Sequence, residues 1–447
     1  MTKLSATVPK RLSTNFLPML DRQVAPPVQP LASVTLPAAD VFSLPNGARL
    51  HIMRNDAQPV VRLQVVFKAG KWYEPNSGVS LLTARMLLEG TSTRTARQIA
   101  DEVAFYGASL ECEQGFDRAT LTLYCLTRHL ESLLPLVYDV LTDPVFPESE
   151  LEQLKTRTIQ NVRVERQKTS YLAAELFSRN LYGAKYPYGN VFDEAVFSSI
   201  PQGVVKAYHQ AAYLLSEAEI FLCGDISNSE EDAVAKLFGQ KSSSAPQPSN
   251  TELFSAPISA PNHTHKVVAD SLQASLRIGR LWPSLTHPDT HRLQVLVKVL
   301  GGYFGSRLMK NIREDKGFTY GIHASIGPRE HASSFAIGTD VNAESIDATI
   351  HEVHHELITL QTELIPQQEL QTVKNYMTGK FANELSTVFE QCDKYKSIIF
   401  FGLSADYYSK FIQAVNEVTS KQLQDLAQQY LSPESMIEVV VGPEQDK

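Results

Sequence analysis

The residues whose types and spacing most directly suggest chemistry are His351, Glu352 and His355. They satisfy the pattern HExxH, in which two histidines one helical turn apart bind zinc and the glutamate activates a water molecule. At about 100° per residue, both histidines fall on the side opposite a stripe of apolar residues, so we expect them to face solvent. That stripe consists of Ile346, Ile350, Val353, Leu357 and Leu360. The pattern therefore predicts adventitious surface binding of metal rather than catalysis.

The segment VLGGYFGSRLMK, residues 299–310, contains a second suggestive feature, a loop with Gly301, Gly302 and Gly305. Glycine-rich loops cradle phosphate when their backbone amides approach an anion closely. This loop lacks the GK[ST] ending and the GxGxxG spacing of nucleotide-binding loops. The sequence therefore does not indicate nucleotide binding, and a ligand-contacting loop and a plain turn remain equal alternatives.

A third segment, residues 69–91, carries the most specific pattern. Gly78 precedes an apolar helical run, VSLLTARMLL, and Glu89-Gly90-Thr91 follows it. With the opening strand LPNGARLHI and the tyrosine-rich stretch 182–189, this order resembles the pitrilysin/insulinase-like (inverzincin) metallopeptidases. The resemblance runs from residue 42 to residue 445, and the length matches the short, two-domain branch that includes processing-peptidase subunits.

In that family the helix reads HxxEH, with two zinc-binding histidines and a glutamate that serves as general base. Aligned residue by residue, the histidines fall on Leu81 and Arg85 and the glutamate on Ala84. The family's third ligand, on a later helix, falls on Asn161 or its neighbour. Because leucine, alanine and arginine offer no lone pair to a metal, we expect no metal site in this chain. We expect Arg85 to form a surface ion pair; the alternative is that it points into the former cleft.

The resemblance also implies two residues in the second half. In the family, an arginine and a tyrosine seven residues apart donate hydrogen bonds to the scissile carbonyl, and they match Arg313 and Tyr320 here. The family's glycine loop lies at the cleft entrance, so the glycines named above become candidates for substrate contact. Alternatively, REDKG is simply a helix C-terminus capped by Gly317, in which Arg313 pairs with a nearby acid.

The elements that would position these residues occur twice. PESELEQLK at 147–155 and PQQELQTVK at 366–374 share a pattern, and each follows an alternating strand segment, ATLTLYCL or SSFAIGTDV. Each copy ends on a β-run that stops at glycine, EIFLCG or IEVVVG. We therefore predict an α+β fold of two homologous domains, each a mainly antiparallel sheet packed with helices.

The boundaries follow from composition. We predict an N-terminal arm at 1–41, a first, degenerate metallopeptidase-like domain at 42–238, a linker at 239–263 and a second domain at 264–447. The linker is rich in serine and proline, which do not easily form a packed element. The proline- and alanine-rich residues 22–41 are expected to form either an extended surface arm or a tail.

Bulk composition narrows the function classes. A chain of 447 residues that is 43% hydrophobic and 20% charged is ordinary for a globular protein of at least two domains. The net charge of −8, without a basic block, argues against nucleic acid as a partner. The four cysteines form no CxxC pair and no apolar run reaches membrane-spanning length. We expect a cytoplasmic location, while the acid-free first 20 residues leave a targeting segment open.

The resemblance implies a division of labour. In the short branch, one subunit carries the zinc helix, and an inactive homologue supplies the arginine and tyrosine. Our first hypothesis is therefore a non-catalytic subunit of a heterodimeric zinc metalloendopeptidase, with zinc in the homologous partner, no cofactor in this chain and a peptide as substrate. The alternative is a structural or interaction protein of a larger complex. A third hypothesis is an independent metalloenzyme that uses the His351 helix.

Overall fold

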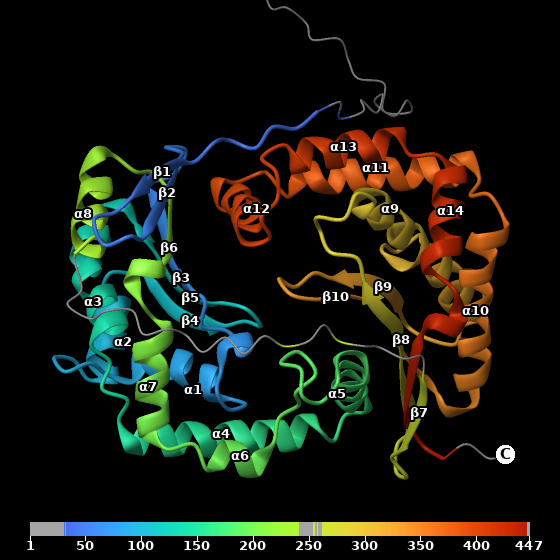
Figure 1. Cartoon of the computed structure of the whole chain (residues 1–447), viewed down its shortest axis with the longest axis horizontal. Helices are drawn as coiled ribbons and strands as arrows, with labels where there is room; N and C mark the ends of the chain where they lie inside the picture. Colours follow the sequence, from blue (N-terminus) through green and yellow to red (C-terminus); the bar gives the residue numbers. More distant parts are fainter. Residues whose placement is uncertain (1–30, 32, 241–253, 255–256, 258–261, 445–447) are drawn as a thin grey trace, which may run out of the picture.

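Two mixed β-sheets, one in each half of the chain, face each other across the molecule (Figure 1). The structure is a computed structural model that describes residues 31, 33–240, 254, 257 and 262–444. The first sheet contains β1 (Asp40–Ser43), β2 (Arg49–Arg54), β3 (Val60–Phe67), β4 (Ser109–Gln114), β5 (Ala119–Leu126) and β6 (Glu219–Gly224). The second contains β7 (Asn262–Val267), β8 (Gln273–Trp282), β9 (Ile322–Gly327), β10 (Ser333–Asn342) and β11 (Ile437–Gly442).

Helices surround both sheets. Those of the first half are α1 (Val79–Met86), α2 (Ala96–Phe105), α3 (Leu130–Thr142), α4 (Glu148–Glu165), α5 (Thr169–Tyr182), α6 (Glu194–Ser198), α7 (Gln202–Ala212) and α8 (Asn228–Phe238). Those of the second half are α9 (Thr290–Gly301), the π-helical segment η5 (Met309–Asp315), α10 (Ile346–Thr362), α11 (Gln367–Asn383), α12 (Val388–Phe400), α13 (Tyr407–Glu417) and α14 (Ser420–Tyr430). Short 3-10 turns connect several of them.

The strand order confirms the predicted α+β fold and the internal duplication. The second sheet runs β7-β11-β8-β10-β9, and the first repeats this order as β2-β6-β3-β5-β4, with β1 added at one edge. In each sheet one pair is parallel, β2 with β6 or β7 with β11, and the others are antiparallel. In β5, alternate residues are buried, as expected for a strand with one face on the core.

The repeated sequence motif PxxELxxxK has the same structure in both halves. It begins α4 after Pro147 and α11 after Pro366. Its lysines are buried, and the Lys374 amine donates a hydrogen bond to the Asn416 carbonyl at 2.9 Å, whereas Lys155 reaches the Ser198 carbonyl at 3.3 Å. A buried ammonium needs such an acceptor, which explains why the lysine belongs to the pattern.

In each half, the helix that follows the PxxELxxxK helix packs against the sheet of the other half. α5, from the first half, packs on β8 and β11 of the second sheet, and α12, from the second half, packs on β2 and β6 of the first (Figure 1). Phe177 and Leu181 of α5 share a buried cluster with Val439, and Cys392 of α12 shares one with Cys223. The apolar face of each exchanged helix therefore completes the core of the other half.

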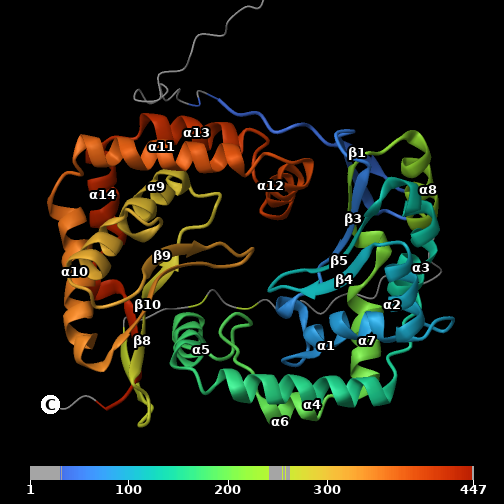
Figure 2. The ribbon, with the colours of Figure 1, turned by 180° about the vertical axis from the view of Figure 1, so that it is seen from behind.

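Two further contacts join the halves, and both can be followed from behind in Figure 2. The β4–β5 and β9–β10 turns meet, because Arg118 of the first donates to Glu330 of the second at 2.5 and 3.1 Å. The chain before β1 runs along α13, where the Val34 carbonyl accepts a hydrogen bond from Ser409 at 2.6 Å. The described part of the predicted arm is thus extended and packed on the surface.

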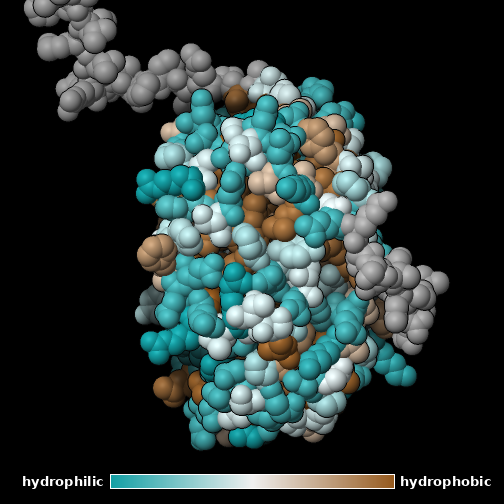
Figure 3. Space-filling view, turned by 90° about the vertical axis from the view of Figure 1, so that its left-hand side faces the viewer, coloured by the Kyte–Doolittle hydropathy of each residue, from teal (hydrophilic) through white to brown (hydrophobic). Residues whose placement is uncertain are grey.

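The predicted linker 239–263 follows α8, and its last two residues belong to β7, which begins at Asn262. Most of the linker lies outside the described residues, as do residues 1–30 of the predicted arm. β1 begins at Asp40, within the segment assigned to the arm. On the outer face of the first half, hydrophilic side chains predominate and hydrophobic ones lie in small separate groups (Figure 3). Among the described residues, no helix combines the length and apolar character needed to cross a bilayer.

Candidate functional site

Helix α1 lies where the resemblance places the metal-binding helix, and its first turn is fixed by Glu74. The Glu74 carboxylate accepts hydrogen bonds from the backbone amides of Gly78 and Ser80, at 3.0 and 3.2 Å, and from the Ser80 hydroxyl at 2.6 Å. Gly78 has φ +98, and a Cβ there would lie 2.4 Å from the Phe197 ring. These contacts fix the start of the helix. Burial raises the pKa of Glu74, and the hydrogen bonds from Ser80 and Gly78 partly oppose that shift.

The side chains on α1 do not fit a zinc ion. Leu81 is half-buried and Ala84 fully buried, whereas Arg85 is exposed. Asn161, on α4, is also exposed. Carbon-only side chains, a guanidinium and an amide do not form a zinc donor set, and a permanent positive charge at this place opposes a cation. No described residue forms an ion pair with Arg85, so the expected surface ion pair is absent.

The HExxH pattern lies on α10, and the prediction that its histidines face solvent is confirmed. His351 and His355 are exposed, while Val353 and Leu357 are buried on the opposite side. Within the described residues, no three His, Cys, Asp or Glu side chains are grouped to hold a metal.

Glu352, the central residue of that pattern, has a different role. Its carboxylate accepts hydrogen bonds from the Asn311 amide at 2.9 Å and from the Lys316 amine at 3.2 Å. The hydrogen bond from Asn311 lowers the pKa of Glu352, and Glu356 also accepts from Asn311 at 2.8 Å. Helix α10 therefore anchors η5, the segment that carries Arg313.

The structure brings Arg313 and Tyr320 together. The Arg313 Nε donates a hydrogen bond to the Tyr320 carbonyl oxygen at 3.1 Å, and its guanidinium lies 4.6 Å from the centre of the Phe304 ring. Glu314 is 3.9 Å from Arg313, too far for a strong ion pair. Gly317 has φ +69, as predicted for a left-handed cap. The segment is thus both a helix end and a scaffold that fixes the guanidinium.

Tyr320 projects from a loop held at its base. The Thr319 hydroxyl donates to the Asp340 carbonyl at 2.8 Å on neighbouring β10. The Tyr320 side chain itself is 96% exposed, and no described residue bonds its hydroxyl. The fixed backbone therefore presents the tyrosine side chain to the surroundings, where its hydroxyl can donate to another molecule.

The glycines of the 301–305 loop have packing reasons for their identity. A Cβ at Gly301 would lie 2.6 Å from the Ala324 backbone nitrogen, so this glycine lets α9 approach β9. A Cβ at Gly302 would meet the Lys298 side chain at 2.8 Å, and one at Gly305 would meet the Tyr303 ring at 2.9 Å. Close packing against β9 therefore accounts for Gly301, and Gly302 and Gly305 pack against Lys298 and Tyr303 of their own segment.

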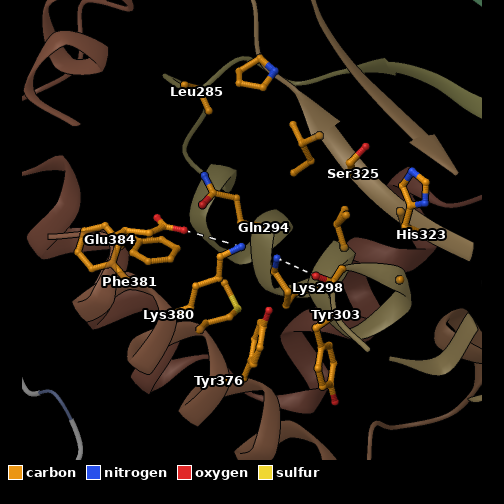
Figure 4. A pocket seen from close by; sticks show the side chains of 18 of the residues that line it. Leu285, Gln294, Lys298, Tyr303, His323, Ser325, Tyr376, Lys380, Phe381 and Glu384 are labelled. Carbon is orange, nitrogen blue, oxygen red and sulfur yellow. Dashed lines mark hydrogen bonds and ion pairs between the residues drawn. The ribbon is translucent and has the colours of Figure 1, made fainter. Parts of the chain in front are cut away.

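The same loop nevertheless borders a cavity of about 820 Å³ (Figure 4). Its walls come from the end of α9, strand β9 and helices α11, α12 and α13, with Phe304 and Gly321 beside the Arg313–Tyr320 pair. Sequence reasoning missed the residues that line it from the helices, including Lys298, Tyr376 and Lys380. Lys298 lies on α9 and the other two on α11, so only tertiary packing brings them to one cavity.

Comparison with known proteins decides the family. The model of the insulinase family, peptidase family M16, matches residues 50–190, and that of the peptidase M16 inactive domain matches residues 199–377. The chain belongs to peptidase family M16. The predicted family membership is therefore confirmed. The first match lies within the first half of the chain, and the second begins in the first half, before α7, and continues into α11 of the second.

Three curated M16 relatives span most or part of the chain. A Bacillus subtilis protein described as an uncharacterized zinc protease, YmxG, is 23% identical, covering 89% of this chain and 97% of the relative. A Helicobacter pylori protein described as the non-peptidase homolog YmxG is 21% identical, covering 85% and 89%. An Arabidopsis thaliana protein described as a probable beta subunit of the mitochondrial-processing peptidase is 24% identical, covering 60% and 52%.

A solved structure agrees in fold over nearly the whole chain. It is a peptidase M16 inactive domain from Pseudomonas fluorescens, with a TM-score of 0.82, 26% identity, and coverage of 92% of this chain and all of that one. Together with the replaced residues on α1, these similarities characterise the chain as a non-catalytic, peptidase-like M16 protein.

Proposed function

We propose that this M16 protein is the non-catalytic subunit of a heterodimeric zinc metalloendopeptidase, and that Arg313 and Tyr320 act on a peptide held at the zinc of a homologous partner. The observation that carries this proposal is the contrast between the two halves. The zinc positions on α1 hold Leu81, Ala84 and Arg85. The Arg313–Tyr320 pair, in contrast, is present and held in place, with Tyr320 exposed and Arg313 half-buried.

The geometry of the pair suits the stabilisation of an oxyanion. The Arg313 Nε is used internally, so the guanidinium keeps its terminal nitrogens for another acceptor. The Phe304 ring and the Tyr320 carbonyl restrict its orientation before any ligand arrives. Donors that are oriented in advance stabilise developing negative charge without a reorganisation cost. The exposed Tyr320 hydroxyl adds a second donor from the same loop.

A peptide has an open strand edge to bind beside this pair. β9 is the edge strand of the second sheet and pairs with β10 on one side. It begins two residues after Tyr320 and lines the cavity. An extended peptide that adds to such an edge gains backbone hydrogen bonds with little dependence on sequence.

A zinc-bearing homologue is the partner that this arrangement requires. The chain supplies donors but no metal ligands on α1, so attack on the scissile bond needs a zinc-bound water from another chain. The description of the Arabidopsis relative as a subunit of a processing peptidase supports a paired assembly.

The test is peptidase kinetics of the complex reconstituted with a homologue that carries HxxEH. Arg313→Ala and Tyr320→Phe should each lower kcat by about 10²-fold with a smaller change in KM, as expected when an oxyanion donor is removed. Arg292→Ala, an exposed arginine on α9, is the matched control and should leave kcat unchanged. Unchanged kcat in both test variants would instead favour a structural or interaction protein without a role in proteolysis.

A further inference from the structure

The cavity beside the Arg313–Tyr320 pair combines an apolar wall with excess positive charge. Part of the wall is aromatic, and the residues that provide this part are Tyr303, Phe304, Tyr376, Phe381, Phe401, Tyr407, Tyr408 and Phe411. Its volume of about 820 Å³ is in the range of pockets that enclose a small ligand. The described charged residues that line it are three lysines and one glutamate, with His323 exposed at the margin. The cavity thus holds an excess of two positive charges.

The single carboxylate that lines the cavity, that of Glu384, lies between two lysines. Glu384 accepts a hydrogen bond from the Lys394 amine at 2.6 Å and lies 3.7 Å from the Lys380 amine. Because Lys394 has the shorter contact, Lys380 is left with a weak partner, and its side chain is 51% exposed toward the cavity and solvent. Lys380 therefore has ammonium hydrogens available for a second anion.

Lys298 has no acidic partner at close range among the described residues. Its amine donates to the Gly302 carbonyl at 3.1 Å and lies 5.9 Å from the centre of the Tyr376 ring. Burial lowers the pKa of Lys298, and the positive charge of Lys380 lowers it further, which means that the two ammonium groups act on each other. Figure 4 shows both side chains directed toward the same part of the cavity.

A carboxylate between these two amines would remove their repulsion and complete their hydrogen bonds. A charge-assisted hydrogen bond in such a partly desolvated place is stronger than one in water. A peptide N-terminus, in contrast, would add a third positive charge and be repelled. Apolar side chains next to the carboxylate would fill the aromatic part of the cavity.

We propose that this cavity binds the C-terminal end of a peptide, with its free carboxylate between Lys298 and Lys380 and its last apolar side chains against the aromatic wall. The proposal rests on the proposed function only for the peptide nature of the ligand. It adds a substrate class, namely peptides or unstructured segments that end in apolar residues with a free carboxylate. Strand β9 connects this cavity to Tyr320, so such a peptide extends from the cavity toward the Arg313–Tyr320 pair.

The test measures binding of fluorescein-labelled hexapeptides to the full chain, without a partner, by fluorescence anisotropy. One peptide ends Leu-Phe-Leu with a free carboxylate, a second is its C-terminal amide, and a third is an amide that carries glutamate as its last residue. The free acid should bind about tenfold tighter than either amide, and added salt should reduce the difference. Equal affinity of the free acid and its amide, or no binding of any peptide, overturns the proposal. Equal affinity of the glutamate amide and the free acid overturns the assignment to a C-terminus.

Variants assign the effect to the two lysines. Lys298→Met with Lys380→Met keeps the apolar length of both side chains and should abolish the preference for the acid over the amide. Lys298→Arg with Lys380→Arg should retain the preference, and Lys421→Met, on α14, is the exposed control. A preference that survives in the double methionine variant contradicts the proposal, provided that its urea unfolding midpoint equals that of the unmodified chain.

The peptide-binding test can fail or succeed independently of the kinetic test of the proposed function. Peptide binding to the chain alone involves neither zinc nor turnover, and Arg313→Ala should keep the acid preference. An acid preference together with unchanged kcat in the Arg313 and Tyr320 variants would leave the cavity proposal standing and refute the oxyanion role. The reverse pair of results would refute the cavity proposal alone.

Discussion

At the scale of single residues, Gly301 links the site to the sheet. It is the last residue of α9, and the close approach of its backbone to Ala324 sets the distance between α9 and β9. Both the cavity and the loop that holds Phe304 depend on that distance. The sequence left the glycines open between a plain turn and a substrate loop. Close packing on β9 gives Gly301 a structural role, and contact of the loop with substrate stays a prediction.

Gly301→Ala should therefore destabilise the protein by about 2 kcal/mol, because overpacking forces the backbone to move. Gly379→Ala is the matched control. Gly379 lies inside α11 with open space around its Cβ position, so alanine there should stabilise by about 0.5–1 kcal/mol. Urea unfolding of both variants measures the two effects, and a neutral Gly301→Ala would show that α9 does not depend on this contact.

His209, buried on α7, predicts a pH dependence of stability. Its Nε2 is 2.9 Å from the Leu141 carbonyl, and burial lowers its pKa from 6.5 to about 4. Above pH 6.5 the imidazole is neutral in both states and contributes no pH dependence. Between pH 6.5 and pH 4 the unfolded chain binds a proton that the folded chain does not, so the free energy of unfolding falls, by up to about 3 kcal/mol at pH 4.

His209→Gln removes this titrating group, and its amide can still donate to the Leu141 carbonyl. Urea unfolding at a series of pH values should show a shallower loss of stability between pH 6.5 and pH 4 in this variant. His351→Gln, at an exposed position, should leave the slope unchanged. Equal slopes for the His209 variant and the unmodified chain would refute the assignment.

At the scale of elements, the exchange of α5 and α12 makes the two halves interdependent. On the α12 side, Arg62 of β3 donates to both carboxylate oxygens of Asp393, at 2.9 and 3.2 Å. His51 of β2 contacts the Tyr395 hydroxyl at 2.9 Å. Because α12 also lines the cavity through Lys394 and Ser397, the packing on the first sheet supports a site in the second half.

Asp393→Ala should destabilise the protein by about 1–2 kcal/mol, because it leaves the largely buried Arg62 guanidinium without its carboxylate. Asp425→Ala, which breaks the exposed pair with Lys421 on α14, is the control and should cost about 0.5 kcal/mol or less. Unfolding in urea compares the variants, and hydrogen exchange should localise the loss of protection to α12. Equal effects of the two variants would mean that the pair does not anchor α12.

The exchange also marks the limit of prediction from sequence. The duplication could be predicted because it shows in local sequence patterns. These are the repeated PxxELxxxK motif, the alternating strands and the β-runs that end at glycine. An amphipathic helix such as α5 shows which face is buried but not which sheet covers it. Similarly, the local resemblance located Arg313 and Tyr320, whereas Lys298 and Lys380 converge only through tertiary packing.

At the scale of the whole molecule, the exchanged helices, the Arg118–Glu330 contact and the arm on α13 bind the two halves together. Near the cavity, the Tyr320 side chain is exposed and Arg313 is half-buried. In the heterodimer that we propose, the partner provides the metal chemistry and this chain provides the oxyanion donors.

This division predicts the metal content of the complex. Purified heterodimer should contain one zinc ion per pair, because the donor set of HxxEH is present in one chain and replaced on α1 of the other. Elemental analysis of the complex and of each chain measures it, with His351→Ala as the control for adventitious binding on α10. Two zinc ions per pair, lost on His351→Ala, would support a metal site on α10 instead.

The central claim is that the two chains together form one peptidase, and titration tests it most directly. A fixed amount of zinc-bearing homologue is mixed with increasing amounts of this chain, and cleavage of an unstructured peptide is followed. We predict that each chain alone is nearly inactive, and that activity rises to a plateau at one equivalent of this chain. Full activity of the homologue alone, or activity that this chain does not change, would contradict the account.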